Sequence, residues 1–177
     1  MPVIEYVPET IAAPEDLVAA IRNRRGGRLL NLDRMLLHSP AFAQGWNSFL
    51  GTVRNQLSVS PRLRELAICL VAVINQAEYE LIQHAPEFIK AGGTDAQLAG
   101  LRNFPRRENY AALFDETERA VIDLTSEMTS YVAVSPPVME KIKNCLPDEQ
   151  QLTEIIGVIA TYNMVSRYLV ALGIEPE

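Results

Sequence analysis

The chain has 177 residues, of which 48% are hydrophobic, and a formal net charge of −6 at pH 7. This length suits one domain with a substantial core, and the apolar content excludes a largely disordered protein. The acidic balance argues against a general nucleic-acid-binding protein, because there is no positive excess to neutralise phosphates. We therefore expect a single soluble domain spanning residues 1–177.

Apolar residues recur at helical spacing along the whole chain. Serine can cap a helix and proline suits its first position, so Ser-Pro pairs predict helix starts at residues 39–40, 60–61 and 135–136. Asp115 with Glu118 predicts a capping box, and Asp148 a further cap. In chain order, the expected helices lie around Leu17–Ile21, Phe42–Val53, Leu63–Ile74, Leu81–Phe88, from Thr94-Asp95 onward, Ala120–Met128, Val138–Cys145 and Leu152–Leu172.

No convincing pair of alternating segments predicts a β-sheet, so the expected fold class is all-α, a multi-helix bundle. The segment Leu66–Ile74 is apolar on every side, which is typical of a helix enclosed by its neighbours. The helix around Leu81–Phe88 should end at Gly92-Gly93, since glycine commonly terminates helices. We expect Leu66–Ile74 to be the best-buried helix.

The two cysteines, Cys69 and Cys145, are far apart and form neither a C-x-x-C pair nor a metal-ligand spacing. Cys69 lies in the apolar segment and should behave as a small buried hydrophobe. The first residues do not resemble a secretory signal, and no apolar stretch is expected to approach the roughly 20 residues that span a bilayer. We expect a cytoplasmic protein without membrane contact.

Three polar residues accompany the most apolar part of the sequence. Glu65 directly precedes the enclosed segment, and Glu80 and His84 are four residues apart, hence on one face of the next helix. That face is otherwise apolar, so its polar groups must be paired, hydrated or functional, because unpaired burial costs several kcal/mol. If the two helices pack as a hairpin, Glu65 can approach Glu80 and His84.

Proton transfer is the chemistry that this trio favours. One carboxylate can orient the imidazole, while a second carboxylate in a poorly solvated pocket has a raised pKa and can donate a proton near neutrality. A satisfied core histidine is the structural alternative. The same three side chains would also be acceptable ligands for a metal ion.

The stretches Pro61–Ile68, Ala77–His84 and Ala91–Thr94 resemble the core of the carboxymuconolactone decarboxylase/AhpD-like family. The resemblance covers roughly residues 31–101, and Tyr162–Arg167 also resembles longer members. In the AhpD branch, a Glu, a C-x-x-C pair and a His form the site. Glu65 and His84 match that Glu and His, whereas Ala77 and Glu80 stand where the cysteines would be. Tyr79, Glu80 and His84 match the decarboxylase-like branch.

The resemblance implies catalytic roles for Glu65, Glu80 and His84, in an enzyme that uses neither a metal nor an organic cofactor. Its substrate would be a small organic acid or lactone. The bidentate geometry of a guanidinium suggests Arg62, Arg64 or Arg34 as a carboxylate ligand, and Tyr79 could offer its hydroxyl to the substrate. The resemblance also implies a homo-oligomer: a dimer, trimer or hexamer.

Four functions are compatible with the sequence. A cofactor-independent lyase or related proton-transfer enzyme leads. A peroxidase-related protein would need a thiolate pair for the family's redox chemistry, which the sequence lacks. A non-catalytic oligomeric binding protein and a metal site are the remaining alternatives.

Overall fold

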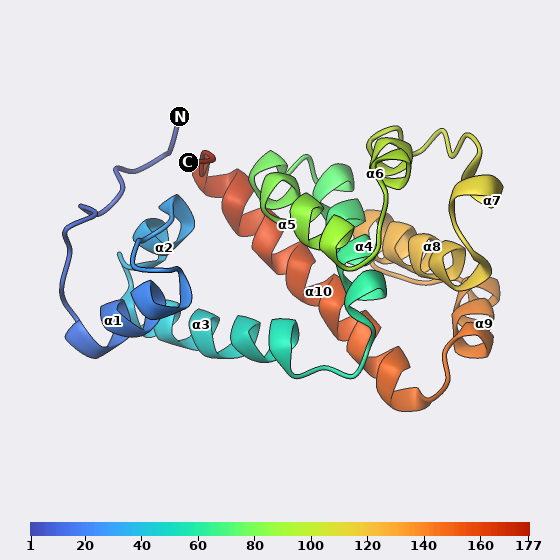
Figure 1. Ribbon diagram of the computed structural model, residues 1–177, viewed down its shortest axis with the longest axis horizontal. Helices are drawn as coiled ribbons and strands as arrows, with labels where there is room; N and C mark the ends of the chain where they lie inside the picture. Colours follow the sequence, from blue (N-terminus) through green and yellow to red (C-terminus); the bar gives the residue numbers. More distant parts are fainter. The chain divides into compact units, whose positions relative to one another are not determined.

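The computed structural model describes residues 1–177, which form ten α-helices and no strand (Figure 1). The all-α fold class is confirmed. Two of the helices, α2 and α7, were not expected from the sequence. The helices are α1 (Glu15–Arg24), α2 (Asn31–Leu36), α3 (Pro40–Asn55), α4 (Pro61–Ile74), α5 (Glu78–Lys90), α6 (Asp95–Arg102), α7 (Tyr110–Leu113), α8 (Glu116–Tyr131), α9 (Pro136–Cys145) and α10 (Glu149–Leu172).

The chain forms two compact units. One comprises Met1–Gln56 and Leu169–Glu177, and the other comprises Leu57–Tyr168. In the first unit, α3 packs against α1 and α2. In the second, α4 packs against α5, α6 and α8, and α8 also packs against α9. The second unit therefore holds every residue of the predicted trio. A single-domain organisation stays a prediction.

Helix α4 is the centre of the second unit. Residues Leu66–Val71 are all 0% exposed, and Ala72 is 1% exposed. Burial of this kind contributes roughly 25 cal/mol per Å² of apolar surface removed from water. The prediction of a fully enclosed helix is confirmed for Leu66–Ala72, while Val73 and Ile74 at its end are half-buried.

Helix starts lie where the sequence indicated. Helices α3, α4 and α9 begin directly after the serine of each Ser-Pro pair. Only Ser60 caps through its side chain, its Oγ accepting a bond from Leu63 N at 3.3 Å. The capping box of Asp115 and Glu118 is confirmed at the start of α8. The Asp148 carboxylate accepts from Gln151 N at 2.8 Å at the start of α10.

Helix α10 is long and apolar enough, by length and composition alone, to cross a membrane. The expectation that no segment approaches such a length is therefore corrected for this helix. Half of its most apolar window is buried inside the protein. Ile155, Val158 and Ile159 are completely buried, as in the core helix of a globular protein.

The turn between α5 and α6 leaves no room for side chains. Gly92 has a φ of +96°, a conformation that L-residues with a Cβ rarely adopt. A Cβ atom at position 93 would overlap the ring of Phe88, which is completely buried and cannot swing into solvent. These two glycines therefore fix where α5 ends and where α6 begins.

We expect Gly93→Ala to lower the free energy of unfolding by about 1–3 kcal/mol, the usual cost of overpacking a core. Gly45→Ala is the matched control, because Gly45 is exposed within α3 and its added methyl would meet no atom. That control should stabilise the protein by about 0.5–1 kcal/mol through helix propensity. Urea unfolding measures both. Equal stabilities of the two variants would contradict the expectation.

Candidate functional site

Glu65 begins the site at the second turn of α4. The Ser60 cap and Pro61 start the helix, so Glu65 lies just before the enclosed segment and is itself 5% exposed. Its two oxygens have different partners: Oε2 lies 2.7 Å from His84 Nδ1, and Oε1 accepts from Arg64 Nε at 3.3 Å. Glu65 thus joins an imidazole to a guanidinium.

The environment keeps Glu65 ionised. Burial by itself favours the neutral acid and is the largest single influence. The hydrogen bond and charge of His84, followed by those of Arg64, act in the opposite direction. Together they lower the pKa of Glu65 below its ordinary value. The carboxylate is therefore an acceptor that orients the imidazole.

His84 lies on α5 with its side chain 12% exposed. When the neutral ring donates its Nδ1 hydrogen to Glu65, its lone pair lies on Nε2, the atom that would accept or deliver a proton. The ring of Tyr162 in α10 packs edge to face against it, with centroids 4.9 Å apart and planes at 87°. Because Tyr162 is 0% exposed, this contact helps to fix the imidazole plane.

Glu80 lies one turn before His84 on α5 and is 2% exposed. Glu80 and Glu65 both influence Cys69, which is fully buried one turn after Glu65 on α4. Burial raises the pKa of the Cys69 thiol, and the charges of Glu65 and Glu80 raise it further. Both carboxylates therefore lie near enough to Cys69 for their charges to act on its thiol. Glu65 and His84 are in direct contact, and Glu80 is their buried neighbour.

The four candidate substrate ligands have different surroundings. Arg64 lies beside Glu65, with its side chain 13% exposed. Tyr79, adjacent to Glu80, is 5% exposed. Arg62 is engaged in a separate network. Arg34, in the first unit, donates from Nε to the Val7 carbonyl oxygen at 2.7 Å. Arg64 is thus the arginine that the structure brings to the Glu65–His84 pair.

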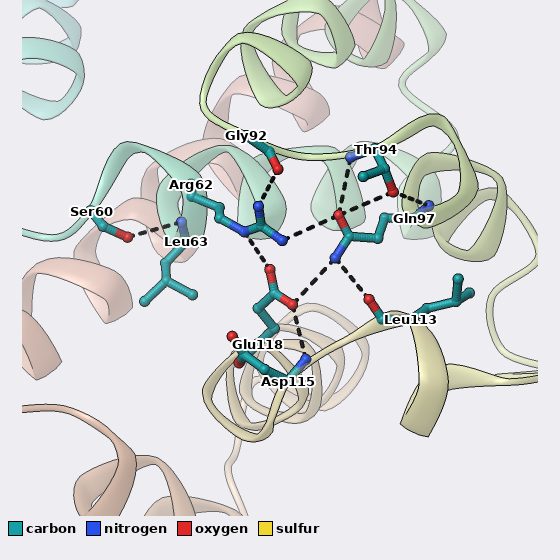
Figure 2. A network of polar contacts seen from close by, with 9 residues as sticks. All are labelled: Ser60, Arg62, Leu63, Gly92, Thr94, Gln97, Leu113, Asp115 and Glu118. Carbon is teal, nitrogen blue, oxygen red and sulfur yellow. Dashed lines mark hydrogen bonds and ion pairs between the residues drawn. The ribbon is translucent and has the colours of Figure 1, made fainter.

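Arg62 belongs to a polar network that joins α4, the α5–α6 turn, α6 and α8 (Figure 2). Its Nε donates to Glu118 Oε1 at 2.6 Å, and its Nη1 donates to the Gly92 carbonyl. Gln97 Nε2 donates to Glu118 Oε2 at 3.3 Å and to the Leu113 carbonyl at 2.9 Å. Since the Glu118 side chain is 3% exposed, Arg62 supplies the charge that balances a buried carboxylate.

Residues 40–106 match the model of the Carboxymuconolactone decarboxylase family. This segment belongs to the carboxymuconolactone decarboxylase family. It takes in α3 to α6, and hence Arg64, Glu65, Glu80 and His84. The resemblance described from the sequence is confirmed, and Tyr162 lies outside the matched segment. No curated protein matches the chain in sequence.

Solved structures show that the fold extends over the whole chain. A peroxidase-related protein from Silicibacter sp. TM1040 matches with a TM-score of 0.82 and 16% identity, covering 99% of this chain and 92% of that chain. An alkylhydroperoxidase AhpD core protein from Ralstonia eutropha JMP134 gives 0.81 and 17%, covering 98% and 91%. A variant of the debrominase Bmp8 in complex with 2,3,4-tribromopyrrole gives 0.79 and 14%, covering 100% and 94%. The AhpD-like fold is thus confirmed.

The two cysteines of the chain do not form a pair. Cys69 is buried in α4, Cys145 is in α9, and both are free thiols. Ala77 and Glu80 occupy the positions that the resemblance assigns to the dithiol. The structure also brings no group of three His, Cys, Asp or Glu side chains into a metal-binding arrangement. Glu65, Glu80 and His84 therefore do not form a preorganised metal-binding group.

Sequence reasoning did not place Tyr162 at the site. It lies within the C-terminal stretch that resembles longer family members, and nothing in its spacing points to α5. The one available signal was its position on the apolar side of a long helix, which indicates burial but not a neighbour. Its contact with His84 depends on how α10 crosses α5.

Proposed function

We propose that this chain is a cofactor-independent enzyme, a decarboxylase-like lyase or a related proton-transfer enzyme, that acts on a small organic acid or lactone. The observation that carries the proposal is the 2.7 Å contact between His84 Nδ1 and a buried carboxylate oxygen of Glu65. A carboxylate-oriented imidazole is a general acid or base whose charged form is stabilised in place. The family match of residues 40–106 supports the same reading.

The proposed reaction uses the chain's own side chains. The C–C bond to a substrate carboxylate breaks, CO2 leaves, and the electron pair of that bond stays on the substrate as an enolate. His84 Nε2 or Glu80 delivers a proton to the carbanionic carbon. Glu65 stabilises the imidazolium before transfer, and water restores the proton afterwards. Arg64 holds a substrate carboxylate, with Tyr79 as a further polar contact.

A peroxidase-related activity is the second candidate, because two structural neighbours bear that description. Such chemistry requires a reactive thiolate. Burial raises the pKa of both Cys69 and Cys145, and nearby carboxylates raise it further. The fold therefore favours the peroxidase-related alternative, whereas the reactive thiolate that this chemistry requires is missing.

We expect a Cys69→Ser/Cys145→Ser double variant to match the parent protein in a thiol-dependent peroxide assay. The reason is that burial raises the pKa of both thiols and that the two cysteines form no disulfide. The single variants serve as controls for packing, since Cys69 is fully buried. Turnover of peroxide by the parent that vanishes in the double variant would reverse this conclusion.

The lyase proposal is tested by incubating the protein with carboxylated lactones and related small acids and measuring CO2 release. Release should depend on the protein and should survive exhaustive dialysis against a chelator. A non-catalytic binding protein would instead melt at a higher temperature in the presence of one compound of this panel of lactones and acids, without consuming it. Binding without CO2 release or proton exchange would favour that alternative.

The proposal includes a setting for the enzyme: a cytoplasmic homo-oligomer that binds neither nucleic acid nor membrane. The net charge of −6 supports the exclusion of nucleic acid. The half-buried window of α10 supports its role as a core helix. Light scattering coupled to gel filtration would give the number of subunits.

A further inference from the structure

Arg64 is a mostly buried guanidinium with unused donors. Its side chain is 13% exposed, and its single hydrogen bond runs from Nε to Glu65 Oε1 at 3.3 Å. The structure offers no protein acceptor to either Nη group. By contrast, Arg62 two residues earlier directs its donors to Glu118, Gly92 and Gln97. The Nη groups are not among the buried polar atoms that lack a partner, so they are open to water or to a ligand.

The two Nη groups of an arginine form a planar fork that fits the two oxygens of a carboxylate. Arg64 therefore presents, one residue from Glu65, the donor set that recognises a small organic anion. A compact anion fits this place better than a phosphate, since only one guanidinium is present to balance it. A carboxylate also agrees with the ligand class of the proposed function.

Glu65 connects this anion site to His84. One of its oxygens faces Arg64 and the other faces His84 Nδ1, so the three side chains form a row. In such a row, the positive charge of Arg64 offsets part of the field that Glu65 exerts on the imidazole. Any change in the charge at Arg64 must therefore be felt at His84.

We propose that Arg64, Glu65 and His84 form an anion-responsive relay, in which a small carboxylate bound on the Nη groups of Arg64 makes the His84 imidazole more basic. The relay rests on the proposed function only for the class of the ligand, a small organic acid. Its consequence is that the binding of an acidic substrate raises the basicity of the imidazole that carries the proton. A protein without substrate would keep that group less basic.

The direction follows from two effects of the same sign. The bound anion adds a negative charge near the imidazolium, which favours the protonated form. If Arg64 turns toward the anion, Glu65 also loses part of its compensation and attracts the proton on His84 more strongly. The other groups around the row are Glu80 on α5, Cys69 on α4 and Tyr162 on α10.

The test is an NMR pH titration of the two histidine rings at constant ionic strength, once in sodium chloride and once in sodium formate. The chain has only His38 and His84, so His38 is an internal control. His38 lies in the first unit, where its Nε2 contacts the Glu5 carbonyl oxygen at 2.8 Å. Formate should raise the titration midpoint of His84 by about 0.3–1 pH unit. That of His38 should stay within the scatter of the measurement.

Two variants assign the effect. Arg64→Gln should abolish the formate response and raise the His84 midpoint in chloride, because a positive charge is removed. Arg64→Lys keeps the charge without the fork and should reduce the response. An equal shift of both histidines, no shift of His84 in saturating formate, or an unchanged response in Arg64→Gln would overturn the proposal. Because no turnover is measured, a missing lyase activity would leave this result standing on its own.

Discussion

Replacement of His84 by asparagine, or of Glu80 by glutamine, is expected to slow the chemical step by about 10²–10⁴-fold while the helical fold persists. These are the usual costs of losing one general acid or base. The physical reason is that both replacements remove a titrating group, and glutamine is also nearly isosteric with glutamate. The measurements are CO2 release from whichever carboxylated lactone or small acid the parent protein consumes, and thermal melting followed by circular dichroism.

Glu87→Gln is the matched control for Glu80→Gln, because it makes the same change on the exposed side of the same helix. It should leave both activity and melting unchanged. If the polar residues have only a structural role, the two site variants should lose about 1–3 kcal/mol of stability and keep full activity. That combination would contradict a role in proton transfer.

Arg62→Ala is expected to lower the free energy of unfolding by about 2–4 kcal/mol. The substitution leaves the Glu118 carboxylate, which is 3% exposed, without its positive partner. Breaking a buried ion pair costs about 3–5 kcal/mol, and the partial exposure of Arg62 reduces that figure. For a protein of this size the loss corresponds to a melting temperature lower by about 5–15 °C.

Arg106→Ala is the control, since Arg106 is exposed and its side chain forms no ion pair. It should melt like the parent. A double variant, Arg62→Leu/Glu118→Leu, should lose less stability than the sum of its single variants, because neither charge is left alone. Additive losses, or a melting point of Arg62→Ala equal to that of the control, would show that the pair is not a stabilising unit.

The helices that the sequence predicted are those with local signals. Ser60-Pro61 followed by a uniformly apolar segment specifies α4 without reference to the rest of the chain. Helix α2 was missed because its signals are not local. Asp33 accepts from Leu30 N at 3.1 Å, but its burial depends on Arg24 and Arg25, which approach from the preceding helix and loop. Six residues without a Ser-Pro start gave no periodicity to detect.

The candidate site also combines local signals, which the sequence shows, with contacts between distant residues, which it does not show. The i, i+4 spacing of Glu80 and His84 predicts a shared face, and a hairpin of α4 and α5 suffices to bring Glu65 to His84. Arg62 and Arg64, by contrast, have equivalent positions in the sequence at the start of α4. They differ because Glu118, distant in sequence, draws Arg62 into the network of Figure 2. Tyr162 likewise meets His84 only because α10 folds against α5.

The most direct test of proton transfer at Glu65 and His84 is the fate of deuterium when the protein and a carboxylated lactone react in D2O. Proton NMR of the product should show one deuterium on the carbon that lost CO2. The rate of its appearance should fall at least about 10²-fold in His84→Asn, with the melting curve preserved. Equal rates of deuterium incorporation in the parent and the variant, or no protein-dependent incorporation with any acid or lactone of the panel, would contradict it.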